Sequence, residues 1–329
     1  MKRLQQISND GWLMKLTGTG RAATRPRNVL FQLTLVLFLS VIQPALSQVK
    51  MQVVSKTVER ELTDVTRLVI NANKADVVVK GWSKASVGLT IRFVAKHPDR
   101  AVAEREADYA GYDVRQRGGI AELTNRYTIP QAAGRLQSAL STTVEVLLPQ
   151  RCGLGVTANF GDVTLGDLTG EVSVKYEYGK LTITNLTGKT TATSAYGDLE
   201  ATNTAGQLTL KTEKANVLLR NLGGLATLQC RYGKLTIRPD ADLTALTVAA
   251  SRTDVTLIPR RIDDFRYDLR NTYAEVNVPG SLREHLGEYM NKQVFDYDVP
   301  ARKPLIKIDN SYSPISLQTL SAAEIVGGK

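Results

Sequence analysis

One motif returns with an 18-residue period between positions 160 and 237 of this 329-residue chain. In each copy an aromatic residue is followed by glycine, one polar residue, and then alternating aliphatic and polar residues. The motif starts at Phe160, Tyr178, Tyr196 and Tyr232, and its phase is kept at Lys214, where the ring is absent. A short fixed period predicts that each repeat is one structural unit stacked on its neighbours.

Each repeat divides into two equal halves with the same internal pattern. The fourth and sixth positions of a half are mostly aliphatic and the fifth is commonly Thr or Ser, which predicts a short strand with one buried face. The second position is small, and this permits a positive φ or a close backbone approach at a corner. Its residues are Gly161, Gly170, Gly179, Gly188, Gly197, Gly206, Ala215, Gly224 and Gly233. We therefore predict an all-β fold, a single-stranded parallel β-solenoid with 18-residue coils.

Equivalent residues of successive coils should lie above one another, about 4.8 Å apart. The sequence predicts two buried aliphatic columns, Val163, Leu181, Leu199, Val217, Leu235 and Leu165, Ile183, Ala201, Leu219, Ile237.

A polar column occupies another register of the same repeat. It consists of Asp167, Asn185, Asn203 and Asn221, which recur with the period of the motif. Stacked amides of this kind form hydrogen-bonded ladders. We interpret the column as a structural ladder that satisfies backbone groups of a turn, rather than as a binding site.

The motif also recurs near residues 73–79, 271–278 and 310–317, outside the strict period. The solenoid domain is therefore expected to span residues 65–320, with irregular coils that cap its ends. Residues 48–64 are expected to be a polar lead-in and residues 321–329 a flexible tail. Short surface helices are predicted at 100–109, starting at Pro98 or Asp99, and at 281–290.

The N-terminal segment has the features of a signal peptide. Arginines precede an apolar run over residues 29–42, and Ala45-Leu46-Ser47 provides small residues for cleavage. We predict that residues 1–47 are a signal peptide cleaved after Ser47, with Met14 as an alternative start. The rival interpretation is an uncleaved anchor, because residues 29–46 approach the length of a membrane span. Polar residues and a proline within that run disfavour the anchor, so no stable membrane span is expected after cleavage.

Charge and cysteines add two expectations. Removal of residues 1–47 lowers the formal net charge from +10 to +5, which does not indicate a nucleic-acid partner. Cys152 and Cys230 are separated in the sequence by more than four of the predicted coils. That is about 20 Å along the solenoid, well beyond the ~7 Å limit between the Cα atoms of a disulfide. We expect two unpaired, structural cysteines.

The series of aromatic-Gly-x-aliphatic-x-aliphatic steps behind a signal peptide resembles a bacterial family of adhesin-type domains, DUF4097 and DUF2807. The resemblance covers residues 65–317 and is clearest over 159–239. It implies a β-solenoid in an envelope protein, and it carries no catalytic signature.

The residues disfavour three kinds of site chemistry. A calcium-binding β-roll needs Asp at the sixth position of each half, where this chain has core residues such as Leu165 and Ile183. The only histidines, His97 and His285, are far apart in sequence, so a His-based metal or catalytic site is disfavoured. The outward residues Asp162, Lys180, Asp198 and Lys234 are interpreted as a solvated face with ion pairs between coils, rather than a carbohydrate-processing groove. We expect no cofactor, no metal and no enzyme activity.

The aromatic residues Phe160, Tyr178, Tyr196 and Tyr232 are the candidate contact residues. Either they pack over one another and close the core at a corner, or they lie exposed and bind a glycan or a protein. The leading functional hypothesis is an exported, non-enzymatic adhesin or scaffold of the periplasm or cell surface. A periplasmic regulatory or stress-response protein with an unknown envelope partner is the alternative. A carbohydrate-active enzyme is the weakest hypothesis.

Overall fold

The computed structural model describes residues 50–299 and 302–319. The predicted signal peptide over residues 1–47 and the predicted tail over 321–329 lie outside the described residues.

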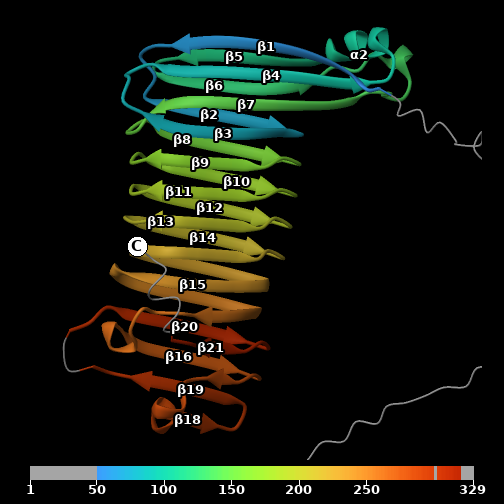
Figure 1. The fold of residues 1–329 in the computed structure, drawn as a ribbon. Helices are drawn as coiled ribbons and strands as arrows, with labels where there is room; N and C mark the ends of the chain where they lie inside the picture. The colour runs from blue at the N-terminus through green and yellow to red at the C-terminus, as the bar shows by residue number, and fades with distance from the viewer. Residues whose placement is uncertain (1–49, 300–301, 320–329) are drawn as a thin grey trace, which may run out of the picture. The chain divides into compact units, whose positions relative to one another are not determined.

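The chain winds into coils, and each coil adds one strand to each of two rows of parallel strands (Figure 1). In its regular part the first row contains β8 Gly153–Asn159, β10 Val172–Glu177, β12 Lys189–Ala195 and β14 Gln207–Glu213. The second row contains β9 Val163–Leu168, β11 Leu181–Leu186 and β13 Leu199–Thr204. β15 Val217–Leu257 runs round several corners without a break and continues both rows. The predicted parallel β-solenoid is confirmed.

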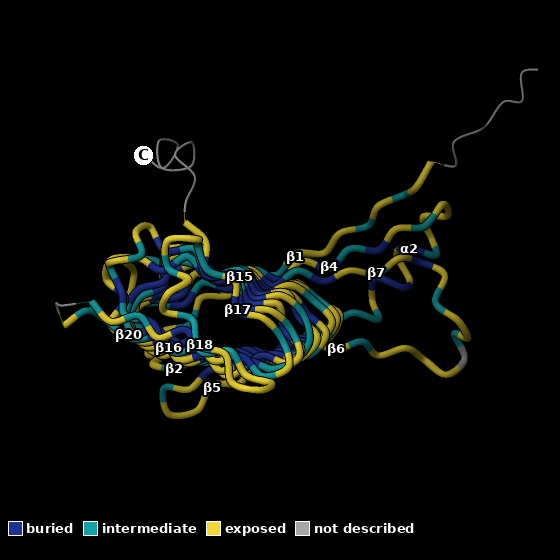
Figure 2. The backbone as a smooth tube through the Cα atoms, turned by 90° about the horizontal axis from the view of Figure 1, so that it is seen from below, coloured by how far each residue is buried: buried dark blue, intermediate teal, exposed yellow. Residues whose placement is uncertain are grey.

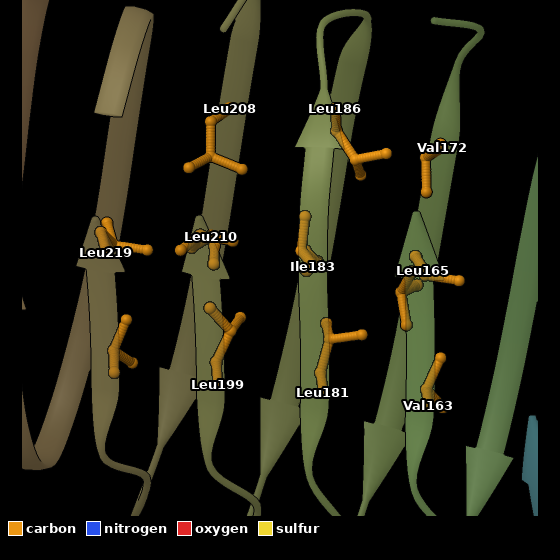
Figure 3. Packing of buried hydrophobic residues seen from close by; sticks show 14 of the residues in the cluster. Val163, Leu165, Val172, Leu181, Ile183, Leu186, Leu199, Leu208, Leu210 and Leu219 are labelled. Atoms are coloured by element: carbon orange, nitrogen blue, oxygen red, sulfur yellow. The ribbon is translucent and has the colours of Figure 1, made fainter. Parts of the chain in front are cut away.

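The register between coils is the sequence period itself. Val172 lies opposite Thr190, and Leu181 lies opposite Leu199, so each residue faces its counterpart in the next repeat. The first predicted aliphatic column is therefore present from Val163 to Val217, with each member at most 2% exposed. Figure 3 shows this column beside the one that contains Leu165 and Ile183. Seen along the solenoid axis, buried residues lie in the interior and exposed residues at the rim (Figure 2). Full burial of each such side chain stabilises the fold by about 1.5–3 kcal/mol.

The corner glycines allow neighbouring coils to touch. A Cβ on Gly179 would lie 2.1 Å from the carbonyl oxygen of Gly161, and a Cβ on Gly161 equally close to that of Ala75. The positive φ at this corner belongs to the preceding residue, for example Tyr178 at φ 57°. Close approach is thus the reason for glycine at Gly161 and Gly179, whereas Gly206, Gly224 and Gly233 combine close approach with a positive φ (85°, 69° and 133°).

At the N-terminal end the first coil is not the outermost one. It consists of β2 Arg67–Asn73 and β3 Ala75–Trp82, and it lies between the coil of β8 and β9 and a coil formed later, β6 Ile120–Tyr127 and β7 Ala139–Pro149. Antiparallel strands complete this end: β4 Val87–His97 on β7, β1 Gln52–Leu62 on β4, and β5 Ala110–Arg117 on β6.

The expectation that residues 48–64 only precede the fold is wrong for β1. This strand pairs along its whole length with β4. No strand among the described residues pairs with its outer edge, and most of its side chains are exposed. This exposure agrees with its polar composition.

The predicted helix over 100–109 is confirmed as α2 Arg100–Ala107. Asp99 caps it by accepting a hydrogen bond from the backbone N–H of Ala101 (2.8 Å). Its buried Glu106 carboxylate accepts backbone N–H groups of Gln137 and Ser138 from the segment before β7. Burial alone would raise the pKa of Glu106, but these hydrogen bonds outweigh it and lower the pKa. No helix within the described residues is long and apolar enough to cross a membrane.

The C-terminal end repeats the arrangement of the N-terminal end. The last coil in sequence, β20 Leu305–Ser311 and β21 Ile315–Leu317, lies between the end of β15 and the coil of β16 Arg266–Thr272 and β17 Val276–Asn277. β19 Lys292–Tyr297 then pairs antiparallel with β16, and β18 Leu286–Tyr289 with β19. Within residues 50–299 and 302–319, three 3-10 helices lie in connections, Gln131–Ala133, Ile262–Asp264 and Gly280–His285.

The second predicted helix, over 281–290, is wrong. Only Gly280–His285 is helical, as a 3-10 helix, and the chain then enters β18. Leu286 lies opposite Phe295 in the hairpin with β19, and Phe295 is fully buried. Pairing and burial in the cap thus override a weak local helix preference.

Both cysteines are free and buried. Burial raises the pKa of the Cys152 and Cys230 thiols, which keeps both in the unreactive protonated form at neutral pH.

Replacing a corner glycine should destabilise the stack. Gly179→Ala places a methyl group against the Gly161 carbonyl, and we expect a loss of about 2–3 kcal/mol. Gly166→Ala is the matched control, because its Cβ would approach only the Thr184 carbonyl oxygen at 4.0 Å. It should be neutral or stabilising by up to ~1 kcal/mol. Urea unfolding followed by circular dichroism measures both, and equal effects would contradict the close-approach explanation.

Candidate functional site

Among the described residues, nine coils turn from the first row to the second through one residue with left-handed backbone conformation, whereas β6 and β7 are joined by the longer connection 128–138. We call these nine residues the corner column. In spatial order they are Lys74, Phe160, Tyr178, Tyr196, Lys214, Tyr232, Arg252, Tyr312 and Tyr273, with φ between 50° and 64°. Six are aromatic and three are basic.

Aromatic stacking links the upper part of the column. The ring centroids of Phe160 and Tyr178 are 4.9 Å apart, and those of Tyr178 and Tyr196 are 5.2 Å apart, with planes within 5° of parallel. At the far end Tyr312 and Tyr273 stack with centroids 5.1 Å apart. The structure therefore brings together three of the four predicted contact residues in one stack.

Between these stacks, rings and cations alternate. The Lys214 Nζ lies 4.7 Å from the ring centroid of Tyr196 and donates a hydrogen bond to its hydroxyl (3.3 Å). That hydrogen bond raises the pKa of the Lys214 amine, which stays charged. The Arg252 guanidinium lies between two rings, 5.6 Å from the centroid of Tyr232 and 4.9 Å from that of Tyr312. Cation–π contacts thus replace ring stacking where the aromatic residue is absent.

The column lies on the surface and does not close the core. Phe160, Tyr178 and Tyr196 are each about half exposed (54%, 49% and 48%). Their parallel stacking turns ring faces toward neighbours in the column, so solvent meets mainly the ring edges. The core-closing interpretation is therefore wrong for these three residues, whose rings pack over one another as the same interpretation expected. Tyr232 is half-buried and contacts Arg252 instead of another ring of the set.

The regular coils have a second turn with the same left-handed conformation, and there the residues are Asp and Asn. Asp167, Asn185, Asn203 and Asn221 also have positive φ, between 52° and 58°. Asn and Asp adopt this conformation readily. Each Asn Nδ2 donates to the side-chain oxygen of the preceding coil, at 2.8, 3.0 and 2.8 Å along the series. The predicted ladder is confirmed, but its partners are side chains rather than turn backbone groups.

Comparison of the two turns marks the corner column as unusual. A left-handed residue other than Gly, Asn or Asp costs about 1–2 kcal/mol, and an aromatic pair returns about 0.5–1.5 kcal/mol. The aromatic residues of the corner column thus contribute little net stability. Asn, which the other turn of the same coils uses, would adopt this conformation at a lower cost. Costly conformations retained at a surface are typical of functional sites.

The outward charged register is structural. Asp162 Oδ1 accepts the backbone N–H of Lys180 in the next coil (2.8 Å), and Asp198 Oδ1 that of Asn216 (2.9 Å). Glu200 accepts from Lys180 (2.9 Å) and from Arg220. Those two hydrogen bonds hold the pKa of Glu200 below its ordinary value. The interpretation as a solvated, paired face is supported, with backbone N–H groups as the partners of the aspartates.

The two histidines do not meet. His97 Nδ1 accepts the backbone N–H of Asp99 beside α2, whereas His285 packs edge-on against Tyr297 in the C-terminal cap. Across residues 50–299 and 302–319 no group of three or more His, Cys, Asp or Glu is arranged to hold a metal ion.

Sequence reasoning missed five members of the corner column: Lys74, Lys214, Arg252, Tyr273 and Tyr312. The motif copies around Tyr273 and Tyr312 were recognisable in the sequence. Arg252 was hidden because it lies outside the strict period of the motif and carries no ring. Lys74 and Lys214 lie in copies of the motif, but they carry no ring, so the sequence does not mark them as contact residues.

The chain matches a model of a known protein family. This model, described as Toastrack DUF4097, matches residues 65–296. A protein from Bacteroides fragilis provisionally named an adhesin aligns at 14% identity, covering 80% of this chain and 97% of that one, with a TM-score of 0.45. A protein from Clostridium sporogenes provisionally assigned to cell adhesion aligns at 11% identity over 82% and 100% of the two chains, with a TM-score of 0.26. No curated protein matches.

Two substitutions of Tyr178 separate backbone strain from ring stacking. Tyr178→Ala removes the stacking and keeps the strain, so it should lower the free energy of unfolding by about 1–3 kcal/mol. Tyr178→Gly removes both, so its stability should remain within about 1 kcal/mol of the wild type. Urea unfolding measures both variants. A Gly variant that is as unstable as the Ala variant would show that the ring is a structural necessity.

Proposed function

The chain belongs to the Toastrack DUF4097 family, and from that premise we propose that it is an exported, non-enzymatic adhesin that binds a glycan along its corner column. The observation that carries the proposal is the column itself, nine left-handed residues in register, with six rings, at a corner where stability alone would favour Asn or Gly.

The repetition of the column suits a repeating ligand. Nine rungs at about 4.8 Å per coil extend over roughly 38 Å. Each rung offers a small, similar contact, so an extended polymer would gain affinity by engaging several at once. A compact ligand would use only one or two rungs.

The exposed chemistry of the column suits an oxygen-rich ligand. The edge of an aromatic ring carries the positive part of its quadrupole and the face the negative part. Because the rings stack on one another, edges and phenolic hydroxyls are what the column presents outward. Sugar hydroxyls can accept from or donate to Tyr178 and Tyr196, and their oxygens suit the ring edges.

The charged side chains beside the column do not suggest catalysis. Asp162 and Asp198 are engaged by backbone N–H groups of the next coil. Glu200, paired with two cations, stays ionised and is a poor proton donor. A glycosidase would need a carboxylic acid with a raised pKa beside a second carboxylate. Export rests on the sequence of residues 1–47, with its basic start, apolar run and small residues before Gln48.

Removal of two rings should weaken glycan binding without unfolding the protein. We expect Tyr178→Gly/Tyr196→Gly to lose at least tenfold in affinity for whichever polysaccharide the wild type binds on a glycan array, because two adjacent rungs disappear. Asn185→Gly/Asn203→Gly is the matched control, since it changes the other turn of the same coils at nearly the same φ. Retained binding by the tyrosine variant, or equal loss in the control, would refute the proposal.

Location in the envelope separates the adhesin from the periplasmic alternative. Protease shaving of intact native cells should release peptides from residues 65–319 while a periplasmic control protein stays protected. Protection of those peptides until the outer barrier is opened would instead favour a partner-binding role inside the envelope.

A further inference from the structure

A shallow hollow of about 640 Å³ runs beside one part of the corner column. It lies over β12, β14, β15 and β20, and it includes the residue that directly precedes each of five successive rungs. These residues are Ala195, Glu213, Arg231, Ser251 and Ser311, which precede Tyr196, Lys214, Tyr232, Arg252 and Tyr312. The five rungs are those in which rings and cations alternate.

Small outward side chains produce the hollow. Ala195, Ala249, Ser251 and Ser311 line it where longer side chains would fill the surface. The hollow crosses several strands, so it runs along the solenoid axis in the same direction as the column. The five rungs follow lining residues directly in sequence, so they lie next to this hollow: Tyr196, Lys214, Tyr232, Arg252 and Tyr312.

The charges around the hollow favour an anionic occupant. Its lining contains Lys211 and Arg231 opposed by Glu213 and Asp309. Asp309 has a cation partner of its own, with its carboxylate 3.8 Å from the Nζ of Lys307. Addition of the two column cations, Lys214 and Arg252, leaves four cations against two acids beside the hollow.

The spacing of the column cations is regular. Lys214 and Arg252 are two rungs apart, about 9.6 Å along the axis, with the Tyr232 ring between them. Aromatic edges add to the positive potential on the same line. A flexible point charge at Lys214 and a forked donor at Arg252 both suit carboxylate or sulfate oxygens.

Resting on the proposed glycan-binding function, we propose that the five-rung segment and its hollow form a subsite for an anionic linear polysaccharide, in which acidic groups of the polymer meet Lys214 and Arg252 while sugar rings lie in the hollow. The shared ligand chemistry is a carboxylate or sulfate on a sugar chain. The three-ring segment from Phe160 to Tyr196 continues the track without charge.

The test measures binding of the purified protein to immobilised polymers by biolayer interferometry. The probes are polygalacturonate, its methyl-esterified form, dextran sulfate, neutral dextran and single-stranded poly-dT. We expect an acidic polysaccharide to bind at least tenfold more tightly than its neutral counterpart. Polygalacturonate against dextran sulfate shows whether carboxylate or sulfate is preferred.

Two charge-matched variants identify the site. Lys214→Gln/Arg252→Gln should lose at least tenfold in affinity for the acidic polymer and show a weaker salt dependence. Lys96→Gln/Arg117→Gln removes the same charge from exposed positions on β4 and β5 and should change affinity less than twofold. Unchanged circular dichroism and melting temperature confirm that both variants are folded.

The failures are distinguishable. Equal binding of neutral and acidic polymers, lost in Tyr178→Gly/Tyr196→Gly but kept in Lys214→Gln/Arg252→Gln, overturns the anionic subsite and leaves the glycan-binding function intact. Binding to none of the polysaccharides overturns both. Binding of poly-dT as tight as that of polygalacturonate, or equal loss in the two charge variants, overturns the subsite in favour of unspecific attraction to polyanions.

Discussion

Hydrogen bonding between equivalent residues of successive coils is the constraint on which the rest of this structure depends. Parallel pairing with a shift of one full repeat places every side chain of the regular coils directly over its counterpart. Three different columns follow from that single register, each with its own chemistry. Aliphatic side chains form the core, amides form a ladder at one turn, and rings with cations line the other turn.

The regular coils were predictable because their period is visible in the residues that the register places together. Val163 and Leu181 share a phase, as do Asn185 and Asn203, and both pairs lie together as expected. The ends were not predictable in the same way. Neither β1 nor β18 has the repeat pattern. β1 is a strand because it pairs antiparallel with β4, and β18 because it pairs antiparallel with β19 in the C-terminal cap. Local sequence cannot report a partner of that kind.

The candidate site was predictable only in part. The motif predicted four aromatic contact residues, whereas the full column of nine residues is recognised only from their backbone conformation. Arg252 enters it because left-handed geometry and coil register, rather than residue type, define membership. Exposure of Tyr178 was also beyond the sequence, because a buried ring and a stacked surface ring produce the same pattern of letters. The Asn turn and the aromatic turn have nearly equal φ, which the residue types of Asn185 and Tyr178 do not indicate.

Both ends of the solenoid are enclosed by coils that are formed out of sequence order. β2 and β3 lie inside β6 and β7, and β20 and β21 lie inside β16 and β17. A solenoid closed in this way cannot grow by addition at its termini, because the outermost coils already carry antiparallel strands. Gain or loss of whole repeats between Phe160 and Tyr232 would change its length, because these coils share one register. Each such unit would lengthen the corner column by one rung and leave both caps unchanged, so the reach of the surface is an evolutionary variable independent of the ends.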